Sequence, residues 1–274
     1  MTEYSSLGHM PRAPLVYTLA MVEYGRIPMM EEYAPQIMEE LRTDYPDINE
    51  FEIRALKINL NTESGKASAE EEIKKQWRLN SSDGDFGVVF GEDRVVFQTA
   101  TYEHFPKFAE RISVILNVIA QFAKISHTQN IGIRYIDNIY PIDGIQLPEL
   151  IGPGYLNPEF NLDLQPLTSR VEYVYASTIG ELYVRCYSLR NHPGVPQDIL
   201  PLVEQLSSAQ ALTMPVSKPF ILVDTDHVYM PRNLEDFDLD AVVEKLDGLH
   251  QQSSLAFRIL ATPKALNAWR KKDE

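Results

Sequence analysis

Alternation between apolar and polar positions predicts most of the fold within one block of the chain, residues 77–140. Residues 86–90 and 94–101 each alternate with a period of two, on either side of a Gly-Glu-Asp turn, which is typical of a β-hairpin. Beyond Tyr102 the apolar residues recur every three or four positions as far as Phe122, which predicts an amphipathic helix. Residues 131–139 alternate again, so we expect the chain to return there to the sheet under that helix.

The same patterns predict further elements on both sides of this block. Strands are expected at residues 15–24, 50–60, 77–80, 170–176, 181–189 and 220–229. Asp238 and Thr262 are typical N-cap residues, and each precedes a helical pattern. Pro263 occupies the first position of the second of these helices, where its missing N–H costs nothing. A shorter helix is expected at residues 199–206.

Two stretches give weaker signals. Residues 30–41 have helical spacing, but Pro35 lies inside the pattern, so the helix is expected to begin near Ala34 or to bend there. Residues 61–72 are polar and contain few large apolar side chains, which indicates a loop.

Runs of strands followed by a covering helix predict an α+β fold of largely antiparallel sheets, each covered by amphipathic helices. This order occurs twice, which suggests two similar halves. Prolines and glycines are frequent after Tyr140, so the expected division is residues 1–140, a Pro/Gly-rich connector at 141–169, and residues 170–274. The sequence does not decide whether the connector is a linker or a functional lid.

Composition narrows the expected environment and partners. The chain has 25 basic and 39 acidic residues, a formal charge of −14, which disfavours nucleic-acid binding and suits either solubility or a basic protein partner. Cys186 is the single cysteine, so no internal disulfide can form. A secretory signal and a membrane-spanning apolar run are both missing from the sequence, and we therefore expect a cytoplasmic location without membrane contact.

Short segments spread along the chain together resemble a sporadically distributed, uncharacterised bacterial protein family. The segments are Ala13-Pro14-Leu15, Trp77-Arg78-Leu79, Thr101-Tyr102-Glu103, Ile133-Arg134-Tyr135-Ile136-Asp137-Asn138 and Ala256-Phe257. The resemblance covers nearly the whole chain and is most specific between Trp77 and Ile139. It implies an accessory protein with a patchy distribution, and it carries over no reaction, ligand or site residue.

Asp224 and Asp226 form the sharpest polar cluster in an apolar context. In a strand both carboxylates point to one face and His227 to the other, so the pair could hold a hard cation such as Mg²⁺. A metal site would need a third ligand, for which Glu181 and Asp163 are candidates. The competing interpretation is a solvated strand face that ends in a turn.

Arg134 and Asp137 are the candidate ligand-binding residues of the strand at 131–139. Arg134 must point away from Ile133 and Tyr135, towards water or towards an acidic neighbour on the sheet. A guanidinium group in that position could bind a carboxylate or phosphate with two hydrogen bonds. A structural ion pair is the alternative.

Tyrosines are frequent on the predicted strands of the second half. Tyr173, Tyr175 and Tyr183 are the candidate binding residues among them, because tyrosine suits interfaces that are apolar at one end and wet at the other. Together they could line a surface that grips a partner. Packing of the sheet under a helix explains them equally well.

The remaining reactive side chains match no catalytic motif. The six histidines lack the spacing of a metal site, so surface or capping positions are expected for them. Cys186 alternates with apolar residues and is expected to be a buried, inert thiol. The sequence contains no phosphate-binding loop, nucleophile elbow or zinc-protease motif.

Three hypotheses for function follow from these patterns. The leading one is a non-enzymatic cytoplasmic protein-binding accessory factor, such as an antitoxin, immunity or defence-system component, with a protein partner or self-association. The first alternative is a metal-dependent hydrolase or nucleotide-handling enzyme that uses Asp224 and Asp226 with Mg²⁺. The second alternative is a small-molecule sensor with a pocket between sheet and helix, for which residues 141–166 would form the lid.

Overall fold

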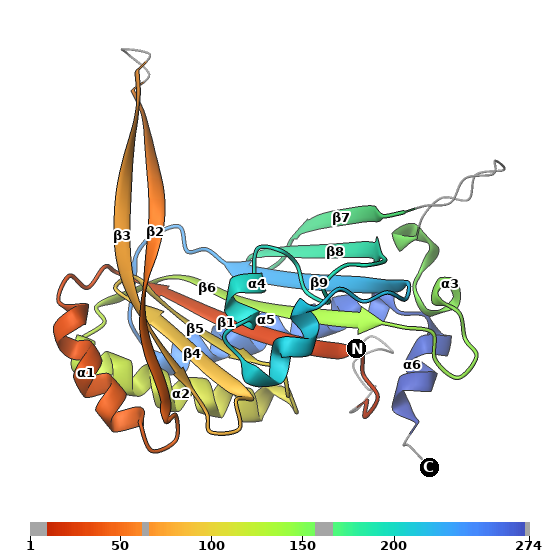
Figure 1. Ribbon diagram of the computed structural model, residues 1–274, viewed down its shortest axis with the longest axis horizontal. Helices are drawn as coiled ribbons and strands as arrows, with labels where there is room; N and C mark the ends of the chain where they lie inside the picture. Colours follow the sequence, from red (N-terminus) through yellow and green to blue (C-terminus); the bar gives the residue numbers. More distant parts are fainter. Residues whose placement is uncertain (1–9, 62–65, 157–166, 272–274) are drawn as a thin grey trace.

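A computed structural model of the chain describes residues 10–61, 66–156 and 167–271 (Figure 1). Within these residues ten strands form one antiparallel sheet. The strands are β1 (Leu15–Tyr24), β2 (Asp47–Asn61), β3 (Lys66–Asn80), β4 (Phe86–Gly91), β5 (Arg94–Thr99), β6 (His127–Ile139), β7 (Ser169–Ala176), β8 (Glu181–Leu189), β9 (Phe220–Tyr229) and β10 (Glu235–Asp236). The helices are α1 (Met30–Leu41), α2 (Phe105–Ala123), α3 (Leu147–Leu150), α4 (Leu200–Val203), α5 (Leu239–Leu260) and α6 (Pro263–Arg270), with 3-10 turns η2 (Pro153–Tyr155) and η3 (Ser207–Thr213).

The strand order is β2-β3-β4-β5-β1-β6-β9-β8-β7, and β10 adds a short pairing to β6. Antiparallel strands and helices that lie outside a regular βαβ alternation confirm the predicted α+β class. The sequence suggested a sheet for each half, whereas the structure has one continuous sheet. The two halves meet where β6 pairs with β9 along its length, from Ile131 opposite Tyr229 to Ile139 opposite Ile221.

The hairpin predicted from the period of two is confirmed with its register. Phe86, Val88 and Phe90 of β4 lie opposite Thr99, Phe97 and Val95 of β5, so both strands bury the same face. Gly84 in the preceding turn has a φ of +69°, a left-handed conformation that favours glycine over residues with a Cβ atom.

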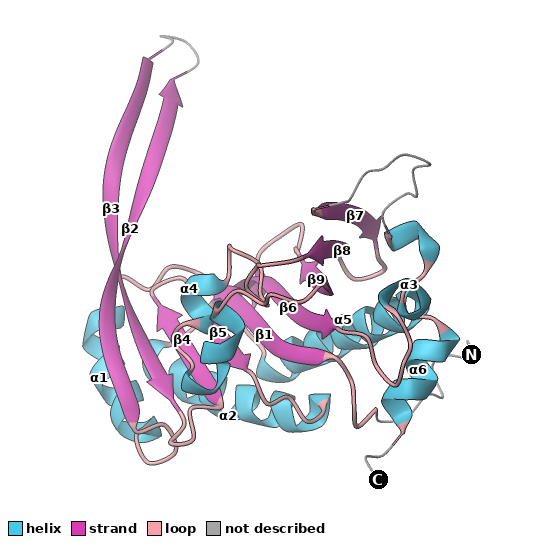
Figure 2. Ribbon diagram, turned by 45° about the vertical axis from the view of Figure 1, so that its right-hand side comes forward, coloured by secondary structure: helices cyan, strands magenta, loops and turns pink. Residues whose placement is uncertain are grey.

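Strands β2 and β3 form a long two-stranded arm that projects from the body of the sheet (Figures 1 and 2). They pair without interruption from Asp47 opposite Asn80 to Asn61 opposite Lys66. The prediction of a loop over residues 61–72 is therefore wrong at Asn61 and from Lys66 onwards, and residues 62–65 lie outside the described part of the chain. The arm buries Trp77 and Leu79 where it joins the body of the sheet, and its outer part extends past the helices.

Helix α1 begins at Met30 and continues through Pro35, so of the two expected outcomes a start near Ala34 is wrong, and a bend there stays a prediction. Proline at this position removes one backbone hydrogen bond, and burial of one face of the helix offsets that loss. The buried residues of α1 are Met30, Ala34, Ile37 and Leu41.

Helices α2 and α5 lie side by side against one face of the sheet (Figure 2). The His104 side chain caps α2 by accepting a hydrogen bond from Lys107 N, and Asp238 caps α5 by accepting one from Ala241 N. Both helices contribute to one apolar core with the central strands; the buried members from the helices include Phe108, Ile112, Ile115, Ile119, Val242, Leu246 and Leu249. Since α5 belongs to the second half of the chain and α2 to the first, the predicted halves share this core.

The segment between β8 and β9 covers the opposite face of the sheet (Figure 2). It contains α4 and η3 and buries Val195, Val203 and Leu206 against Tyr17 of β1 and Ile136 of β6. The sheet is therefore covered on both faces in its centre, and the side chains of β6 are buried on both sides.

The described part of the Pro/Gly-rich connector packs at the end of the sheet, away from the central core. Ile151 forms an isolated β-bridge with Ala261, and Thr262 Oγ1 donates a hydrogen bond of 2.6 Å to the Glu149 carbonyl oxygen. Thr262 also caps α6 by accepting from Ala265 N at 3.2 Å, as predicted. Among the described residues, no helix is long and apolar enough to span a membrane.

Candidate functional site

The alternation of β6 places the two candidate residues Arg134 and Asp137 on opposite faces of the sheet. Arg134 lies on the face of Ile136, which packs with the α4 segment, whereas Asp137 lies on the face of Tyr135, which packs with α2 and α5. The two side chains therefore belong to different environments, although the sequence grouped them as one ligand-binding site.

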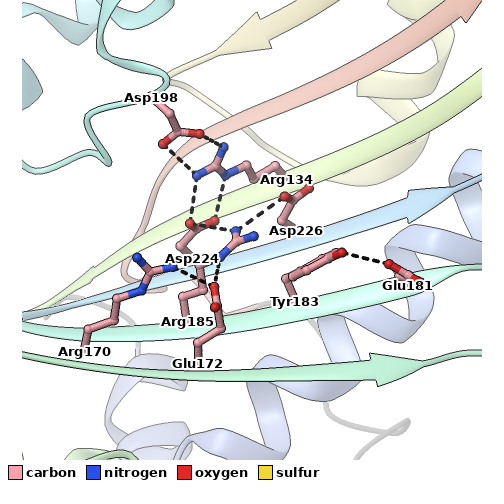
Figure 3. Close-up of polar contacts among 9 residues, drawn as sticks. All are labelled: Arg134, Arg170, Glu172, Glu181, Tyr183, Arg185, Asp198, Asp224 and Asp226. Carbon is pink, nitrogen blue, oxygen red and sulfur yellow. Dashed lines mark hydrogen bonds and ion pairs between the residues drawn. The ribbon is translucent and has the colours of Figure 1, made fainter. Parts of the chain in front are cut away.

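Arg134 is held by two carboxylates (Figure 3). Its Nε and Nη2 atoms donate to Asp224 Oδ1 and Oδ2 at 2.7 Å and 2.8 Å, which is a bidentate pair. Nη1 and Nη2 also donate to Asp198 at 2.6 Å and 3.2 Å. Burial lowers the pKa of Arg134, but the hydrogen bonds and charges of Asp224 and Asp198 outweigh it and raise this pKa above its ordinary value. The structural ion pair is thus the interpretation that fits Arg134.

A second arginine extends this arrangement along the same face. Arg185 Nη1 lies 3.2 Å from Asp224 Oδ2 and 3.4 Å from Asp226 Oδ2, while its Nε donates to Glu172 at 2.6 Å. Arg170 also donates to Glu172. We call the residues Arg134, Arg170, Glu172, Arg185, Asp198, Asp224 and Asp226 the arginine cluster (Figure 3).

This geometry differs from the Mg²⁺ site that the sequence offered as an alternative. Asp224 and Asp226 do share one face, as predicted, and His227 points to the other. The Asp224 side chain is fully buried and accepts hydrogen bonds from two guanidinium groups, which leaves it little capacity for a cation. Among the described residues, no group of three His, Cys, Asp or Glu side chains could hold a metal ion; Asp163 lies outside them.

The three candidate tyrosines are divided between the faces as well. Tyr173 and Tyr175 of β7 stack with ring centroids 6.2 Å apart, and they are 38% and 46% exposed at the edge of the sheet. Tyr183 of β8 lies on the opposite face, beneath Arg185 and with its hydroxyl donating to Glu181 at 2.8 Å. The predicted tyrosine surface is therefore two separate patches.

A cavity of about 460 Å³ lies between the sheet and helices α2 and α5. Ligand-binding pockets in proteins commonly have volumes of about 300–1,000 Å³, so this cavity has the size for a small organic molecule. The lining residues that bear on its chemistry are Tyr102, Phe105, Tyr135, Asp137, Thr225 and His250.

Asp137 is the group in this cavity that the fold does not explain. Its side chain lies in the interior, and the residue is 4% exposed. It makes no hydrogen bond or ion pair with any residue that the structure describes, and burial alone raises its pKa from 3.8 to about 8. Asp137 therefore carries a proton at neutral pH, unless a bound group stabilises its charge.

Tyr135 and His250 form a polar pair on the cavity wall. The Tyr135 hydroxyl lies 2.7 Å from His250 Nδ1, and the imidazole stacks on Phe105 with ring centroids 4.6 Å apart. Burial lowers the pKa of His250 from 6.5 to about 4, so the imidazole is neutral at pH 7. In the neutral ring one nitrogen is the N–H donor and the other the acceptor, so the tautomer of His250 decides which group donates in its contact with Tyr135.

Two further polar atoms of the cavity walls lack partners. Thr225 Oγ1 is buried and makes no hydrogen bond within the described part of the chain. The same holds for the Tyr102 hydroxyl, which lies near Tyr135 without hydrogen-bond geometry; burial raises the pKa of Tyr102 to about 12. Buried polar groups are normally hydrogen-bonded, so unpaired oxygens next to a lone carboxyl mark a place for a ligand's polar groups.

Two sequence expectations about the histidines and the connector are corrected at this site. His250 lines the cavity, and His227 is fully buried with hydrogen-bond contacts to Ser177 and the Leu249 carbonyl, so neither is a surface residue. His104 does cap a helix, as expected. No described residue of the connector lines the cavity, and residues 157–166 of the predicted lid lie outside the described residues.

Sequence reasoning identified Asp137 but missed the residues around it. Tyr102 and Phe105 come from the start of α2, Thr225 from β9 and His250 from α5, and their meeting depends on the order of strands in the sheet. A signal was present in His250, a polar residue adjacent to Leu249 on the apolar side of its helix. Asp198, in the irregular segment before α4, gave no signal of its role as a partner of Arg134.

The buried thiol is confirmed. Cys186 is 1% exposed, and burial raises the pKa of its thiol to about 12, so the thiolate required of a nucleophile is not populated at neutral pH.

Comparison with known proteins assigns no family to this geometry. A scan against protein-family models finds no match for the chain, and a search of curated proteins finds no similar one. The resemblance to a sporadically distributed bacterial family stays a prediction from short sequence segments.

Proposed function

We propose that this protein is a small-molecule-binding protein, a sensor or carrier whose ligand occupies the cavity between the sheet and helices α2 and α5. The observation that carries the proposal is Asp137, a buried carboxyl group without a partner among the residues that the structure describes, which faces a cavity of about 460 Å³. This is the function that the geometry supports best.

The cost of burying such a group favours a functional role. A polar group removed from water without a compensating hydrogen bond destabilises a fold by about 1–3 kcal/mol, and an ionised one by more. An apolar residue of similar size at position 137 would avoid this cost. A ligand that supplies the missing hydrogen bonds removes this cost, so its binding is favoured, which is typical of a preorganised binding site.

The test is a fragment screen by protein-observed NMR, combined with native mass spectrometry of protein purified from its host. We expect fragments to shift the resonances of Tyr135 and His250, and Ser254→Phe to weaken binding by about 10-fold or more, because Ser254 lines the cavity and the larger side chain fills it. Gln251→Phe is the matched control, since Gln251 lies on the exposed side of the same helix. Fragments that bind nowhere, or that bind Ser254→Phe as tightly as the wild type, would contradict the proposal.

The second candidate function is protein binding, as an accessory factor of the antitoxin, immunity or defence kind. It is favoured by β7, which is the last strand of the sheet and exposes Tyr173, Val174 and Tyr175, with Val174 53% exposed. An edge strand with exposed aromatic residues can accept a strand from a partner, and the net charge of −14 favours a basic one.

A tagged pull-down from the native host tests this second candidate. A stoichiometric basic partner should be lost from Val174→Pro, because proline on the outer strand removes a backbone donor and narrows the conformations of the edge. Val114→Pro would unfold α2 and is unsuitable as a control; Val114→Asp on the exposed face of α2 adds a charge elsewhere and should retain the partner. Recovery of the protein alone would count against protein binding.

A further inference from the structure

The chemistry of the cavity defines a class of ligand, an inference that rests on the proposed function. Asp137 is the one buried carboxyl group without a partner among the described lining residues. A ligand that pairs with it must offer hydrogen-bond donors, since an ionised carboxylate is an acceptor only.

The aromatic lining suits a positive charge next to this carboxyl group. Tyr102 meets Tyr135 edge to face, with ring centroids 5.7 Å apart and planes at 85°, and Phe105 covers the imidazole of His250. Phe257 contributes another ring to the lining. Aromatic rings attract organic cations through their electron-rich faces, and the attraction increases where water is excluded.

The other charged and titratable groups that face the cavity include both acidic and basic side chains. Glu103 and His104 lie on the segment before α2, and Glu103 is exposed and paired with Lys107. His250 on α5 is neutral at pH 7, and Arg258 on the same helix lines the cavity and has an interaction of its own. Burial and the charge of Arg270 lower the pKa of Arg258. These groups leave Asp137 as the deepest site for a counter-charge.

We propose that the ligand is an organic cation with N–H donors, an alkylammonium or amidinium group on a small apolar body, and that its charged end pairs with Asp137. Thr225 Oγ1 and the Tyr102 hydroxyl supply further hydrogen-bonding oxygens within the same cavity. The aromatic rings enclose the apolar body of the ligand.

Binding of a cation at Asp137 releases a proton, whereas binding of a neutral molecule or an anion does not. Free Asp137 holds a proton at pH 7, and pairing with a cation requires the carboxylate. The cation therefore displaces the proton, which leaves to solvent, and about one proton is released for each ligand bound at pH 7. Above the pKa of Asp137 the group is already ionised, so proton release falls towards zero.

Isothermal titration calorimetry with four probes of similar shape tests the ligand class. Benzylamine and benzamidine carry the cation, whereas benzyl alcohol is neutral and benzoate is an anion. We expect the cations to bind at least about 10-fold more tightly than benzyl alcohol, as charge-assisted hydrogen bonds do. Repeating the titration in buffers with different heats of ionisation measures the released proton.

Variants separate the ligand class from the proposed function. Asp137→Asn should remove the preference for cations and the proton release while benzyl alcohol binds as before; Asp44→Asn, at an exposed carboxyl group outside the cavity, should keep both. Benzyl alcohol or benzoate that binds as tightly as the cations overturns the ligand class and leaves the small-molecule function in place. Absence of binding by all four probes overturns the class as well, and the fragment screen then decides the function. Should Asp137→Asn fail to fold, the proton release of the wild type gives the same decision.

Discussion

The two faces of β6 handle buried charge in opposite ways. On one face, Arg134 makes four hydrogen bonds with Asp198 and Asp224, and the arginine cluster continues through Arg185. On the other face, three residues further along, Asp137 has no partner in the described chain and borders a cavity. The fold itself accounts for the first arrangement. It leaves the second unexplained, and a binding site is therefore expected at Asp137 and a structural role at Arg134.

The largest effect is expected from Asp137→Asn. The pKa of Asp137 is about 8 in the folded protein against an ordinary 3.8, so between these pH values the folded protein holds a proton that the unfolded chain has released. Wild-type stability therefore falls as pH rises from about 4 to about 8, by on the order of 5 kcal/mol once the group is ionised in both states. Asp137→Asn lacks this loss, so its free energy of unfolding should increase with pH relative to that of the wild type.

Urea unfolding of both proteins at about pH 5 and about pH 9 measures the change. Asp44→Asn is the control, because Asp44 is exposed and should leave the pH profile of the wild type unaltered. If the two proteins differ in free energy of unfolding by the same amount at both pH values, Asp137 has a partner. The contrast between the two faces of β6 would then disappear.

The next effect in size is expected from Arg134→Gln. This substitution leaves Asp224, whose side chain has 0% exposure, with the longer contact to Arg185 as its remaining ion pair. Removal of one partner from a buried ion pair typically destabilises a protein by about 3–5 kcal/mol. Arg170→Gln is the matched control; its side chain is 56% exposed, and a loss below about 1 kcal/mol is expected.

A double substitution tests whether the arginine cluster does anything besides hold the packed fold together. Arg134→Met with Asp224→Leu removes both charges together, and pairs replaced in this way are often neutral or stabilising. We expect thermal unfolding to show recovery of most of the stability that Arg134→Gln loses, and binding of probes in the cavity to be unaltered. A double variant that is as unstable as the single one would mean that the paired face is not explained by charge neutralisation.

The sequence predicts this division between faces only in part. The period of two along residues 131–139 predicts that Arg134 points away from Ile133 and Tyr135, and of the two surroundings left open for it, water or an acidic neighbour, the structure has the second. The sequence grouped Asp137 with Arg134, whereas the structure places the two on opposite faces. The sequence does not reveal which face has a complete set of partners. That depends on the pairing of β6 with β9 and on Asp198, which comes from a segment without regular structure.

The same reasoning explains where the fold was predicted well. Helix α2 buries one face and carries the periodicity of that face in its sequence. Strands β4 and β5 are buried along almost their whole length, and their apolar residues on either side of a turn identify them. The start of β3 carries no such signal; there the arm projects from the body of the sheet, and its backbone pairs with β2. The continuous sheet was missed for a related reason: which strands become neighbours is a property of tertiary packing, and both halves have the same local patterns.

The smallest effect is expected at the exposed end of the arginine cluster. The Asp198 side chain is 63% exposed, so solvent screens its attraction to Arg134, and Asp198→Asn should destabilise the protein by about 1 kcal/mol or less at neutral pH. Burial tends to raise the pKa of Asp198, but the hydrogen bond and charge of Arg134 prevail and lower it below 3.8. The stabilisation is thus present above about pH 4 and is lost as pH falls through the folded-state pKa.

This dependence on pH has the opposite sign to that of Asp137. In urea unfolding, the difference in free energy of unfolding between Asp198→Asn and the wild type should stay constant from about pH 5 to about pH 9 and shrink at acid pH. At acid pH the corresponding difference for Asp137→Asn is also small. Glu204→Gln, on the exposed side of the same segment, should behave as the wild type throughout. If the stability lost in Asp198→Asn instead increases towards pH 9, an unpaired charge titrates within the arginine cluster. The assignment of the binding site to Asp137 alone would then no longer hold.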